Sequence, residues 1–472
     1  MPPSRTRVAV VGAGISGLAL GFHLQRLGVE AQVLEERERA GGNIRSEHRQ
    51  GYLCEWGPNG WLDNEPATAR LVEALGMREQ VVQASVAASR RWIVRHGKLR
   101  LLPEKPQAFL SSDVLSLRGR LRVLLEWAQP ARRDGASESV FDFAARRIGR
   151  EAAEVLVDAM VTGIYAGDSR RLDMECAFPR LREMERRHGG LFRALAAKRR
   201  AARQASASGG GAPRHTGSAM GPGGTLTSFT DGMESIVHVL SSRLSEHLRL
   251  GTAVEGIEPV VVREAGVHRW RLALPGGGSL EAEHVVLASP AWKVAPLLRP
   301  LDPDLAGATE RIPSAPVAVV CLGFAAPDLQ HLTPGFGFLV PGCEGLPILG
   351  TLFDSWVFPH RSDARHILMR TMLGGARDPG AVEASDAELA ERTLGTLRRL
   401  LGLRADPERV FVVRHPRGIP QYPVGHRHTL ERIDTALTRH AGLHLSGNSY
   451  RGIAMNACIK EAEALAQRLA GI

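Results

Sequence analysis

The chain has 472 residues, of which 44% are hydrophobic and 23% are charged, and its formal net charge is +10. This length exceeds a single ordinary core and predicts two or three domains of a globular protein. No stretch reaches the roughly 18 uncharged apolar residues that a membrane-spanning helix needs. The N-terminus has no signal-peptide architecture, so we expect the protein to stay in the compartment where it is made.

Cysteine and arginine usage narrow the class of protein further. The five cysteines form no C-x-x-C pair, which argues against a disulfide framework or a thiolate metal site and predicts free, buried thiols in a reducing cytoplasm. Almost all the basic residues are arginine, which suits nucleic acid, an anionic membrane surface or an acidic small molecule, or reflects genome composition alone. Aromatic residues make up only 5% and no nucleic-acid motif is present, so we expect no nucleic-acid partner.

The first forty residues predict a dinucleotide-binding unit. Residues 7–11 (RVAVV) are a continuous apolar run, typical of a parallel strand that is buried on both faces. The G-x-G-x-x-G of residues 12–17 follows, then leucines at helical spacing, and then a second strand at 31–34 that ends at Glu35. An ordinary strand–helix–strand unit with a glycine-rich turn is the alternative.

Each position in this pattern has a physical task. Gly12 permits a tight turn, Gly14 lets the backbone approach a pyrophosphate, and Gly17 lets the helix pack closely on the strand. The helix N-terminus offers N–H groups to phosphates, and Glu35 is placed to bind ribose hydroxyls. Residues 39–42 (RAGG) look like the R-x-G-G extension of amine-oxidase-like flavoproteins, which favours FAD over NAD.

Distant stretches are expected to return to the same domain. Residues 444–448 read as a strand that ends in a turn, and residues 457–469 as a helix whose N-terminus points at the flavin. In mid-chain a helix is predicted after residues 228–233, and residues 285–288 read as another strand. A plain amphipathic helix with a capping turn is the alternative for the C-terminal segment. Together these patterns predict one FAD domain assembled from three separated stretches.

Two arginine-rich segments are predicted to be helical. A helix over residues 110–125 has leucines on one side and could rest on an anionic membrane surface or on the protein's own core. Residues 186–230 contain no Asp or Glu and predict a basic helix, followed at 206–224 by a flexible loop or linker rich in Gly, Ser and Pro. His426 and His428 lack metal-site spacing, and we expect them at the surface or in a loop.

Four further sequence blocks point to a known family. They are residues 55–60 (EWGPNG), 161–168 (VTGIYAGD), 335–341 (GFGFLVP) and 418–422 (GIPQY). In this order they resemble the oxygen-dependent, FAD-containing protoporphyrinogen oxidases, and the likeness extends over nearly the whole chain. The resemblance implies an α/β fold with a Rossmann-type FAD domain of the p-hydroxybenzoate-hydroxylase type, a mixed-sheet substrate domain and a mostly helical, membrane-associating domain.

The same resemblance implies domain limits. The FAD domain is expected at residues 5–88, 222–295 and 412–472, and the substrate domain at 89–102 and 296–411. The helical domain is expected at 103–221, with its basic flexible loop at 186–221.

Site residues are carried over from the resemblance position by position. The residues that match substrate contacts are Arg91, Gly163, Phe336, Leu339 and Met372. Arg91 is expected to pair with a substrate propionate and Asn59 to lie close to the flavin, and these two are the catalytic candidates. The plainer alternatives are a surface arginine for Arg91 and ordinary core positions for the apolar residues. The residues that match FAD contacts are Gly12, Ala13, Gly14, Ile15, Ser16, Gly17, Glu35, Glu36, Arg39, Gly41, Gly42, Asn43, Gly57, Pro58, Asn59, Gly60, Val254, Gly447, Ile453, Ala454 and Met455.

The implied activity is oxidation of protoporphyrinogen IX to protoporphyrin IX in haem biosynthesis. It comprises three two-electron rounds of hydride transfer to the flavin, with O2 as acceptor and H2O2 as product, and it needs no metal. The alternative substrates are coproporphyrinogen III and an amine. The alternative to an enzyme is a flavin-free binding protein of the same fold. The expected location is the cytoplasm or the cytoplasmic face of the inner membrane. The sequence leaves three points open: whether a quinone replaces O2 as electron acceptor, whether the protein forms a homodimer, and whether the product is handed over to the chelatase.

Overall fold

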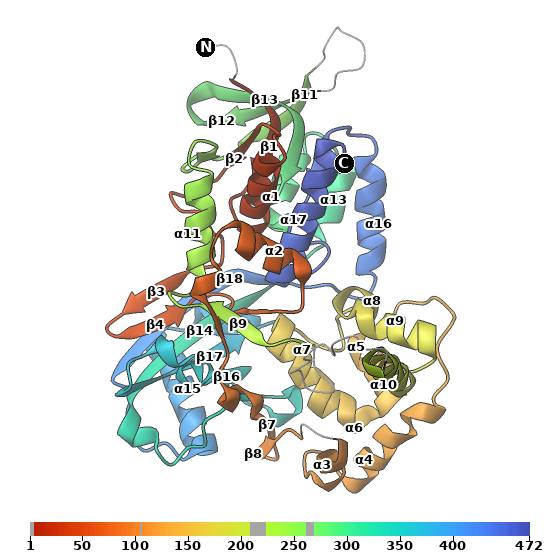
Figure 1. The fold of residues 1–472 in the computed structure, drawn as a ribbon, viewed down its shortest axis with the longest axis vertical. Helices are drawn as coiled ribbons and strands as arrows, with labels where there is room; N and C mark the ends of the chain where they lie inside the picture. The colour runs from red at the N-terminus through yellow and green to blue at the C-terminus, as the bar shows by residue number, and fades with distance from the viewer. Residues whose placement is uncertain (1–3, 104–105, 208–222, 261–268) are drawn as a thin grey trace. The chain divides into compact units, whose positions relative to one another are not determined.

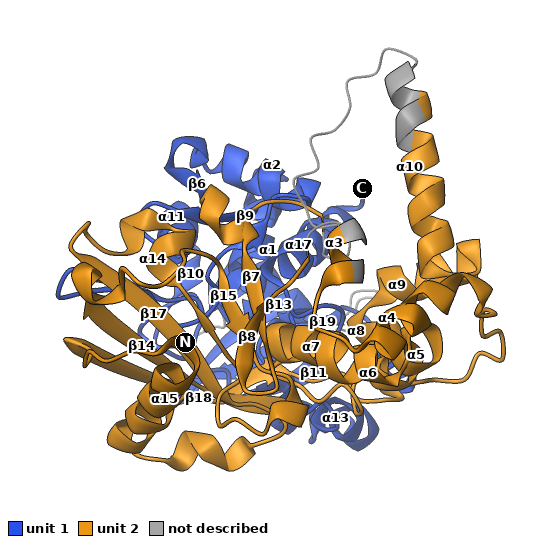
Figure 2. Ribbon diagram, turned by 90° about the horizontal axis from the view of Figure 1, so that it is seen from below, with its two compact units in different colours: residues 1–83, 226–313, 427–472 blue, residues 84–225, 314–426 orange. Residues whose placement is uncertain are grey.

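The computed structural model describes residues 4–103, 106–207, 223–260 and 269–472 (Figure 1). The chain divides into two compact units, each assembled from separated stretches (Figure 2). Unit 1 comprises Met1–Gln83, Leu226–Pro313 and Arg427–Ile472, and unit 2 comprises Ala84–Thr225 and Ser314–His426. The finer division into three domains stays a prediction.

Unit 1 is built on a seven-stranded sheet whose central strands are parallel. Strand β1 pairs with β2 on one side and with β13 on the other, and the second half of β13 also pairs in parallel with β19. The first half of β13 instead forms an antiparallel edge with β12, which pairs with β11. The strands are β1 (Ser4–Val11), β2 (Ala31–Leu34), β10 (Leu248–Arg249), β11 (Gly256–Val260), β12 (Arg269–Leu274), β13 (Gly278–Leu287) and β19 (Leu443–Leu445).

Helices cover both faces of this sheet because its central strands are apolar on both sides. Val8 and Val10 of β1 pack in one core with α1, α2, α11 and α17, whereas Ala9 and Val11 pack in another core with α12, α13 and α16. This arrangement confirms the buried parallel strand that the apolar run predicts. The helices are α1 (Ile15–Arg26), α2 (Pro66–Ala74), α11 (Glu234–Arg243), α12 (Ala291–Leu298), α13 (Pro303–Glu310), α16 (His426–Leu437) and α17 (Met455–Ala470).

Two small antiparallel sheets complete unit 1. One joins β3 (Ser46–Arg49) to β4 (Tyr52–Glu55), and the other places β9 (Leu226–Phe229) between β5 (Trp61–Leu62) and β6 (Val81–Gln83).

Unit 2 contains a second seven-stranded sheet, in the order β18-β14-β17-β16-β15-β7-β8. Only the β7–β15 pair is parallel, so the sheet is mixed, as expected for the substrate part of the fold. Helix α15 (Asp386–Leu401) packs on one face through a core that includes Ala318, Phe338 and Leu389. The strands are β7 (Arg91–Arg95), β8 (Lys98–Leu101), β14 (Ser314–Ala325), β15 (Gly337–Leu339), β16 (Gly350–Leu352), β17 (His366–Gly374) and β18 (Arg409–Pro420).

The helical part of unit 2 differs from the prediction in one place. The continuous helix expected over residues 110–125 is broken into α3 (Pro106–Ser111), α4 (Leu117–Leu124) and the 3-10 turn η3 (Leu125–Ala128). Ser116 starts α4 afresh, since its side chain accepts a hydrogen bond from the Gly119 N–H at 3.0 Å. The remaining helices are α5 (Val140–Ile148), α6 (Arg150–Ala152), the π-helical turn η4 (Ala153–Val157), α7 (Asp158–Tyr165), α8 (Met174–Ala177), α9 (Pro179–His188) and α10 (Leu191–Ala207).

An exposed apolar patch lies on α4 and η3. We call it the α4–η3 patch; it consists of Leu117, Leu121, Leu125 and Trp127, which are 64%, 54%, 56% and 49% exposed. Helix α10 begins beside it, because Arg193 donates to the Trp127 carbonyl oxygen at 2.9 Å. The patch therefore combines apolar side chains with the arginine-rich helix, and contact with an anionic membrane surface stays a prediction.

A buried ion pair joins η3 to the start of α10. Glu126 and Arg147 are both fully buried and form an ion pair with each other. The Glu126 carboxylate also accepts hydrogen bonds from the Leu191 and Phe192 N–H groups, at 2.7 and 3.1 Å. One carboxylate thus neutralises a buried arginine and caps a helix.

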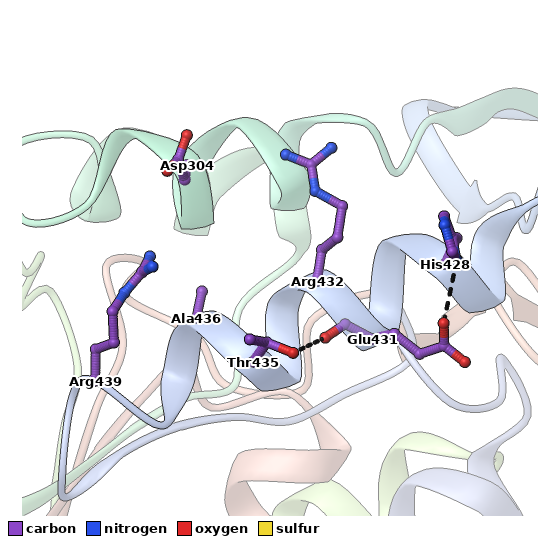
Figure 3. A pocket seen from close by; sticks show the side chains of 7 residues that line it. All are labelled: Asp304, His428, Glu431, Arg432, Thr435, Ala436 and Arg439. Carbon is purple, nitrogen blue, oxygen red and sulfur yellow. Dashed lines mark hydrogen bonds and ion pairs between the residues drawn. The ribbon is translucent and has the colours of Figure 1, made fainter.

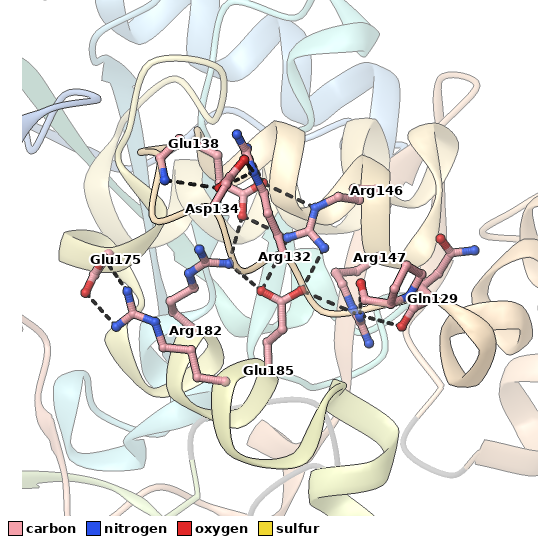
Figure 4. Close-up of polar contacts among 12 residues, drawn as sticks. Gln129, Arg132, Asp134, Glu138, Arg146, Arg147, Glu175, Arg182 and Glu185 are labelled. Atoms are coloured by element: carbon pink, nitrogen blue, oxygen red, sulfur yellow. Dashed lines mark hydrogen bonds and ion pairs between the residues drawn. The ribbon is translucent and has the colours of Figure 1, made fainter.

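The pair continues into a larger network (Figure 4). Glu185 accepts from Arg146 at 2.7 Å and also forms an ion pair with Arg182, which reaches Glu138 at 3.1 Å. Burial alone would raise the pKa of Glu185, but hydrogen bonds from Arg146 and the nearby arginine charges hold it below its usual value. Glu138, Arg182 and Glu185 are therefore buried together with charges of opposite sign.

Three expectations are corrected or left open by the structure. His426 is buried at the start of α16 and its ring stacks on Tyr422 with 4.3 Å between centroids, so the surface or loop position expected for it is wrong. All five cysteines are free, but Cys343 is exposed rather than buried. Most of the loop predicted at 206–224 lies outside the described residues. No described helix is long and apolar enough to cross a membrane.

Candidate functional site

The glycine turn after β1 shows why two of its glycines are needed by the fold itself. Gly12 has a φ of +105°, and a Cβ there would lie 2.6 Å from the Ser289 Oγ, at the end of β13. A Cβ at Gly17 would overlap the Gly12 carbonyl oxygen. Helix α1 therefore packs directly on the turn, as the sequence predicts.

Gly14 is different, and this difference tests whether the turn fits a dinucleotide. Apart from its chain neighbours and the backbone of its own helix, no described atom lies within 4 Å of a Cβ built at Gly14, and its φ of −68° is accessible to any residue. Gly14 is also the N-cap of α1 and supplies no side-chain cap to the helix. Neither packing nor backbone conformation demands glycine here, whereas close approach of a pyrophosphate to an open helix N-terminus does. The turn therefore fits the pyrophosphate of FAD.

Glu35, the predicted ribose-binding residue, is held in place by hydrogen bonds from the glycine turn and from its own strand end. Its carboxylate accepts hydrogen bonds from the Ala13 N–H at 2.8 Å and from the Arg37 N–H at 3.2 Å. Its carbonyl accepts from the Thr252 N–H at 2.7 Å, which brings the segment of Val254 alongside. This geometry orients the carboxylate at the end of β2, where a ribose is expected.

The residue next to Glu35 lies in a more open place. Glu36 is half-exposed and pairs with Lys293 at 2.9 Å. Its predicted contact with FAD stays a prediction.

Arg39 supports the loop of the R-x-G-G block. Its guanidinium donates to the carbonyl oxygens of Gly42 and Ile44, at 2.8 and 3.2 Å, and pairs with Glu234 at 2.9 Å. The Gly41 N–H donates to the Ala13 carbonyl oxygen at 2.7 Å. These contacts hold the loop against the glycine turn.

Sequence reasoning missed the carboxylates that fasten this loop. Ser46 donates to Glu55 at 2.6 Å, and the Ser46 N–H donates to Glu234 at 2.9 Å. Glu55 also accepts from the Met233 N–H at 2.8 Å. The only sequence signal was the presence of Glu55 in the EWGPNG block and of Glu234 directly after the turn at 231–233.

The EWGPNG block lies next to the same loop. A Cβ at Gly57 would overlap the Asn43 carbonyl oxygen, and a Cβ at Gly60 would overlap that of Thr227. Asn59 lies buried between these close backbone contacts, next to Pro58. The block therefore contacts Asn43, a predicted cofactor residue, and the mid-chain strand β9.

The C-terminal stretch returns to this region, as expected. A Cβ at Gly447 would lie 3.7 Å from the Ser16 Oγ, in the first turn of α1. The Gly447 N–H donates to the Glu461 carboxyl at 3.4 Å. Burial raises the pKa of Glu461, which favours its uncharged form beside the turn predicted to bind phosphate.

Helix α17 begins next to the EWGPNG block. Asn456 donates to the Leu62 carbonyl oxygen and accepts from Thr68, both at 2.8 Å. Residues 453–455, namely Ile453, Ala454 and Met455, form the uncapped start of α17. The Ala457 N–H donates to the Ala454 carbonyl oxygen at 2.9 Å, which leaves the N–H groups before it to an acceptor outside the helix, such as a flavin carbonyl.

A histidine pair lies on two neighbouring strands of unit 1, β13 and β19. The His444 Nε2 and the His284 Nδ1 are 3.3 Å apart. Burial lowers the pKa of His444 to about 4, and the charges of His284 and Arg468 act in the same direction. The described residues contain no cluster of three or more His, Cys, Asp or Glu side chains that could hold a metal ion.

The predicted substrate residues of unit 2 meet on one face of its sheet. Leu339 pairs with Gly350 across β15–β16, and Gly350 pairs with Met372 across β16–β17, so the three form one row. Gly350 has no side chain between its two apolar neighbours, which are both half-buried. Arg91 pairs with Gly337, two residues before Leu339, and therefore lies on the same face. This is the face opposite α15.

Phe336 and Gly163 complete this row. The Arg91 guanidinium carbon lies 4.8 Å from the centroid of the Phe336 ring, in a cation–π contact. Gly163 of α7 packs on Leu339, since a Cβ there would lie 2.9 Å from a Leu339 methyl carbon. We call the five residues Arg91, Gly163, Phe336, Leu339 and Met372 the unit 2 face.

The GIYAGD and GIPQY blocks also meet in unit 2. The Gln421 side chain donates to the Tyr165 carbonyl oxygen at 2.8 Å, where α7 ends. Tyr165 and Tyr422 are in edge contact with 6.0 Å between ring centroids. Part of each block therefore serves to fix the end of α7.

A separate groove lies between α13 and α16 (Figure 3). It has a volume of about 320 Å³ and contains none of the predicted site residues. Its lining residues are Asp304, His428, Glu431, Arg432, Thr435, Ala436 and Arg439. With charged residues of both signs and a mutual contact of 3.1 Å between His428 and Glu431, it is a polar surface groove.

The fold and the convergent glycine turns define an α/β protein built to hold a dinucleotide. The sequence model of the family described as flavin containing amine oxidoreductase matches residues 15–470. The chain belongs to this flavin-containing family, which implies FAD as cofactor.

Individual relatives show which members of the family the chain is similar to. The chain is 30% identical to chloroplastic protoporphyrinogen oxidase of Nicotiana tabacum, over 100% of this chain and 86% of that protein. It is 26% identical to coproporphyrinogen III oxidase of Bacillus subtilis (strain 168), over 98% of each. The crystal structure of a protein named "Putative protoporphyrinogen oxidase" from Exiguobacterium sp. 255-15 superposes with a TM-score of 0.80 at 25% identity, covering 100% of this chain and 99% of that one.

Proposed function

We propose that the chain is an FAD-dependent porphyrinogen oxidase whose substrate is protoporphyrinogen IX. The observation that carries the proposal is the unit 2 face, where residues from four distant segments form an apolar row with a cation at one edge. A porphyrinogen is a large, mostly apolar ring with carboxylates on one rim, and this face offers a matching distribution of groups. The full-length likeness to protoporphyrinogen oxidases supports the same substrate class.

Each residue of the face has a defined part in this proposal. Leu339 and Met372 contact the apolar ring, and the absence of a side chain at Gly350 makes room for the Leu339 side chain between them. Arg91 forks onto a carboxylate, a contact worth roughly 1.5–3 kcal/mol. Its stacking on Phe336 restricts the guanidinium before the substrate arrives, which lowers the entropic cost of that contact.

The cofactor residues of unit 1 hold and orient FAD. The turn at Gly14 and the start of α1 bind the pyrophosphate, and Glu35 binds the ribose. When bound, FAD supplies the two-electron acceptor for each of three oxidation rounds, with O2 as final acceptor and H2O2 as product. Asn59 is proposed to contact the cofactor, because it is buried and follows by two residues Gly57, which packs on the Asn43 carbonyl oxygen.

Coproporphyrinogen III is the second candidate substrate, because the Bacillus subtilis relative named for it matches the chain from end to end. It carries four carboxylates where protoporphyrinogen IX carries two. The two candidates are separated by measuring kcat/KM for each under identical conditions.

The decisive experiment is anaerobic mixing of the purified, FAD-loaded protein with protoporphyrinogen IX. We expect the oxidised flavin absorbance to bleach, and porphyrin fluorescence to appear when air is admitted. Arg91→Met is expected to raise KM by about tenfold to a hundredfold. Arg90→Met is the matched control, because Arg90 directly precedes β7, is exposed as Arg91 is, and donates to the Pro334 carbonyl oxygen. An unbleached flavin with both porphyrinogens would overturn the proposal.

A further inference from the structure

A cluster of polar contacts fastens α7 to the strands of the unit 2 face. Asp158, the first residue of α7, accepts hydrogen bonds from Ser169 at 2.7 Å and from the Gly342 N–H at 2.8 Å. Arg377 donates to the same carboxylate at 2.6 Å and to the Thr162 Oγ at 2.6 Å. We call these five residues the α7 clasp.

The clasp is largely enclosed and sterically specific. Asp158, Thr162 and Ser169 are all buried. A Cβ at Gly342 would overlap the Arg377 guanidinium, so a larger residue there would displace the guanidinium from its present position. The guanidinium bridges two positions one helical turn apart, Asp158 and Thr162, and thereby fixes both the place and the rotation of α7.

The residues that bind α7 in the clasp come from loops next to the unit 2 face. Gly342 follows β15, the strand of Leu339, and Arg377 follows β17, the strand of Met372. At its other end α7 is held by the Ala376 N–H, which donates to the Ala166 carbonyl oxygen at 2.8 Å. Helix α7 is therefore tied at both ends to the loops that leave the two strands of the apolar row.

Gly163 lies between these two attachments and packs on Leu339. A rotation of α7 would move the Gly163 backbone away from Leu339 and open the row. We propose that Arg377 is a positioning residue for substrate binding, which acts by holding Gly163 against Leu339. This inference rests on the proposed function, because it assumes that the substrate lies on the unit 2 face.

The experiment compares Arg377→Met with Arg377→Lys in the FAD-loaded full chain. Lysine keeps a positive charge for Asp158 but cannot donate to Thr162 in the same fork geometry, so it should be intermediate. For Arg377→Met we expect KM for protoporphyrinogen IX to rise about tenfold, with kcat and FAD content nearly unchanged. Arg414→Met is the matched control, since Arg414 forms a similar fork in unit 2, with Asp386 and the Ala384 carbonyl oxygen.

Two readouts distinguish positioning from general loss of stability. Combined with Leu339→Ala, Arg377→Met should raise KM by clearly less than the product of the two single effects, because both changes disrupt one contact. Amide hydrogen exchange should become faster in residues 158–166 of Arg377→Met and stay unchanged in α15.

Each possible outcome has a definite meaning. Unchanged exchange in residues 158–166 would overturn the inference whatever the substrate is, and so would an unchanged KM or multiplicative effects on KM. If the wild-type flavin is not bleached by any porphyrinogen, the proposed function fails instead. In that case the exchange result still decides whether Arg377 positions α7.

Discussion

Replacing Glu126 by glutamine tests whether the buried ion pair stabilises unit 2. The substitution keeps the shape of the side chain and one oxygen for the Leu191 N–H, but it removes the charge that faces Arg147. Both side chains of the pair are fully buried, so solvent cannot screen the remaining guanidinium charge.

The expected magnitude follows from the contacts that Arg147 keeps. Breaking a buried pair by removing one partner costs about 3–5 kcal/mol. Arg147 would retain Glu185 at 3.5 Å and the carbonyl oxygens of Gln129 and Pro130 at 2.9 and 3.2 Å. These contacts compensate part of the charge, and we therefore expect the lower end, about 3 kcal/mol. The Tm should fall by roughly 6–12 °C.

Urea denaturation of the wild type and variants measures this loss as a shift of the midpoint at constant slope. The matched control is Glu310→Gln, because the Arg299–Glu310 pair is similarly short, 2.8 Å, but about 60% exposed on both sides, and should change stability by less than about 1 kcal/mol. Adding Arg147→Met to Glu126→Gln should restore part of the loss, because the buried cation is then gone. A loss below about 1 kcal/mol for Glu126→Gln would refute the reasoning.

Three further predictions concern the cofactor turn, the histidine pair and the α4–η3 patch. Gly14→Ala should change the stability of the FAD-free protein by no more than about 0.5 kcal/mol but weaken FAD binding at least tenfold. Gly17→Ala should destabilise the FAD-free protein itself. If the two variants changed stability and FAD binding equally, the fit of the turn to a pyrophosphate would be contradicted. Since the pKa of His444 is about 4 in the folded protein and 6.5 when unfolded, the unfolded state takes up the proton first, and stability should fall by up to about 3 kcal/mol as the pH drops from 6.5 to 4. His444→Gln should flatten that decline in denaturation midpoints; an unchanged pH profile would show that other groups cause it. The double variant Leu121→Glu, Trp127→Glu should abolish co-sedimentation with vesicles that contain anionic lipid, and wild-type protein that does not sediment would contradict a lipid-binding patch.

Local patterns predicted most of unit 1, because its signals are short in sequence. Strand β2 was expected at 31–34 and is found there, and α17 begins at Met455, two residues before the expected start. The glycine turn, its flanking strand and the position of Glu35 depend on neighbours within a few residues. The division of β13 between an antiparallel hairpin and a parallel pair with β19 depends on partners that are far away in sequence, and periodicity does not encode it.

Buried charged and aromatic groups lie beyond what local sequence patterns predict. The sequence led to no prediction for Glu126, Arg147 or Glu185, because nothing local distinguishes a buried ion network from a solvated face. His426 was expected at the surface or in a loop, whereas it is buried at the start of α16 and stacks on Tyr422. Burial of such groups is decided by whether a partner arrives from another segment, and that information is tertiary.

The unit 2 face shows how the family-like blocks combine contact with support. Leu339 and Met372 are candidates for substrate contact. They lie in one row only because the register of three strands pairs each of them with Gly350. Gln421 belongs to an equally distinctive block, but its side chain binds the end of α7 and not the face itself. A sequence block shared with a family therefore contains two kinds of residue: those expected to contact the substrate and those that hold the contact residues in place. Arg377 fits this pattern although it lies outside every block, because the place of α7 depends on its fork as much as on Gly163.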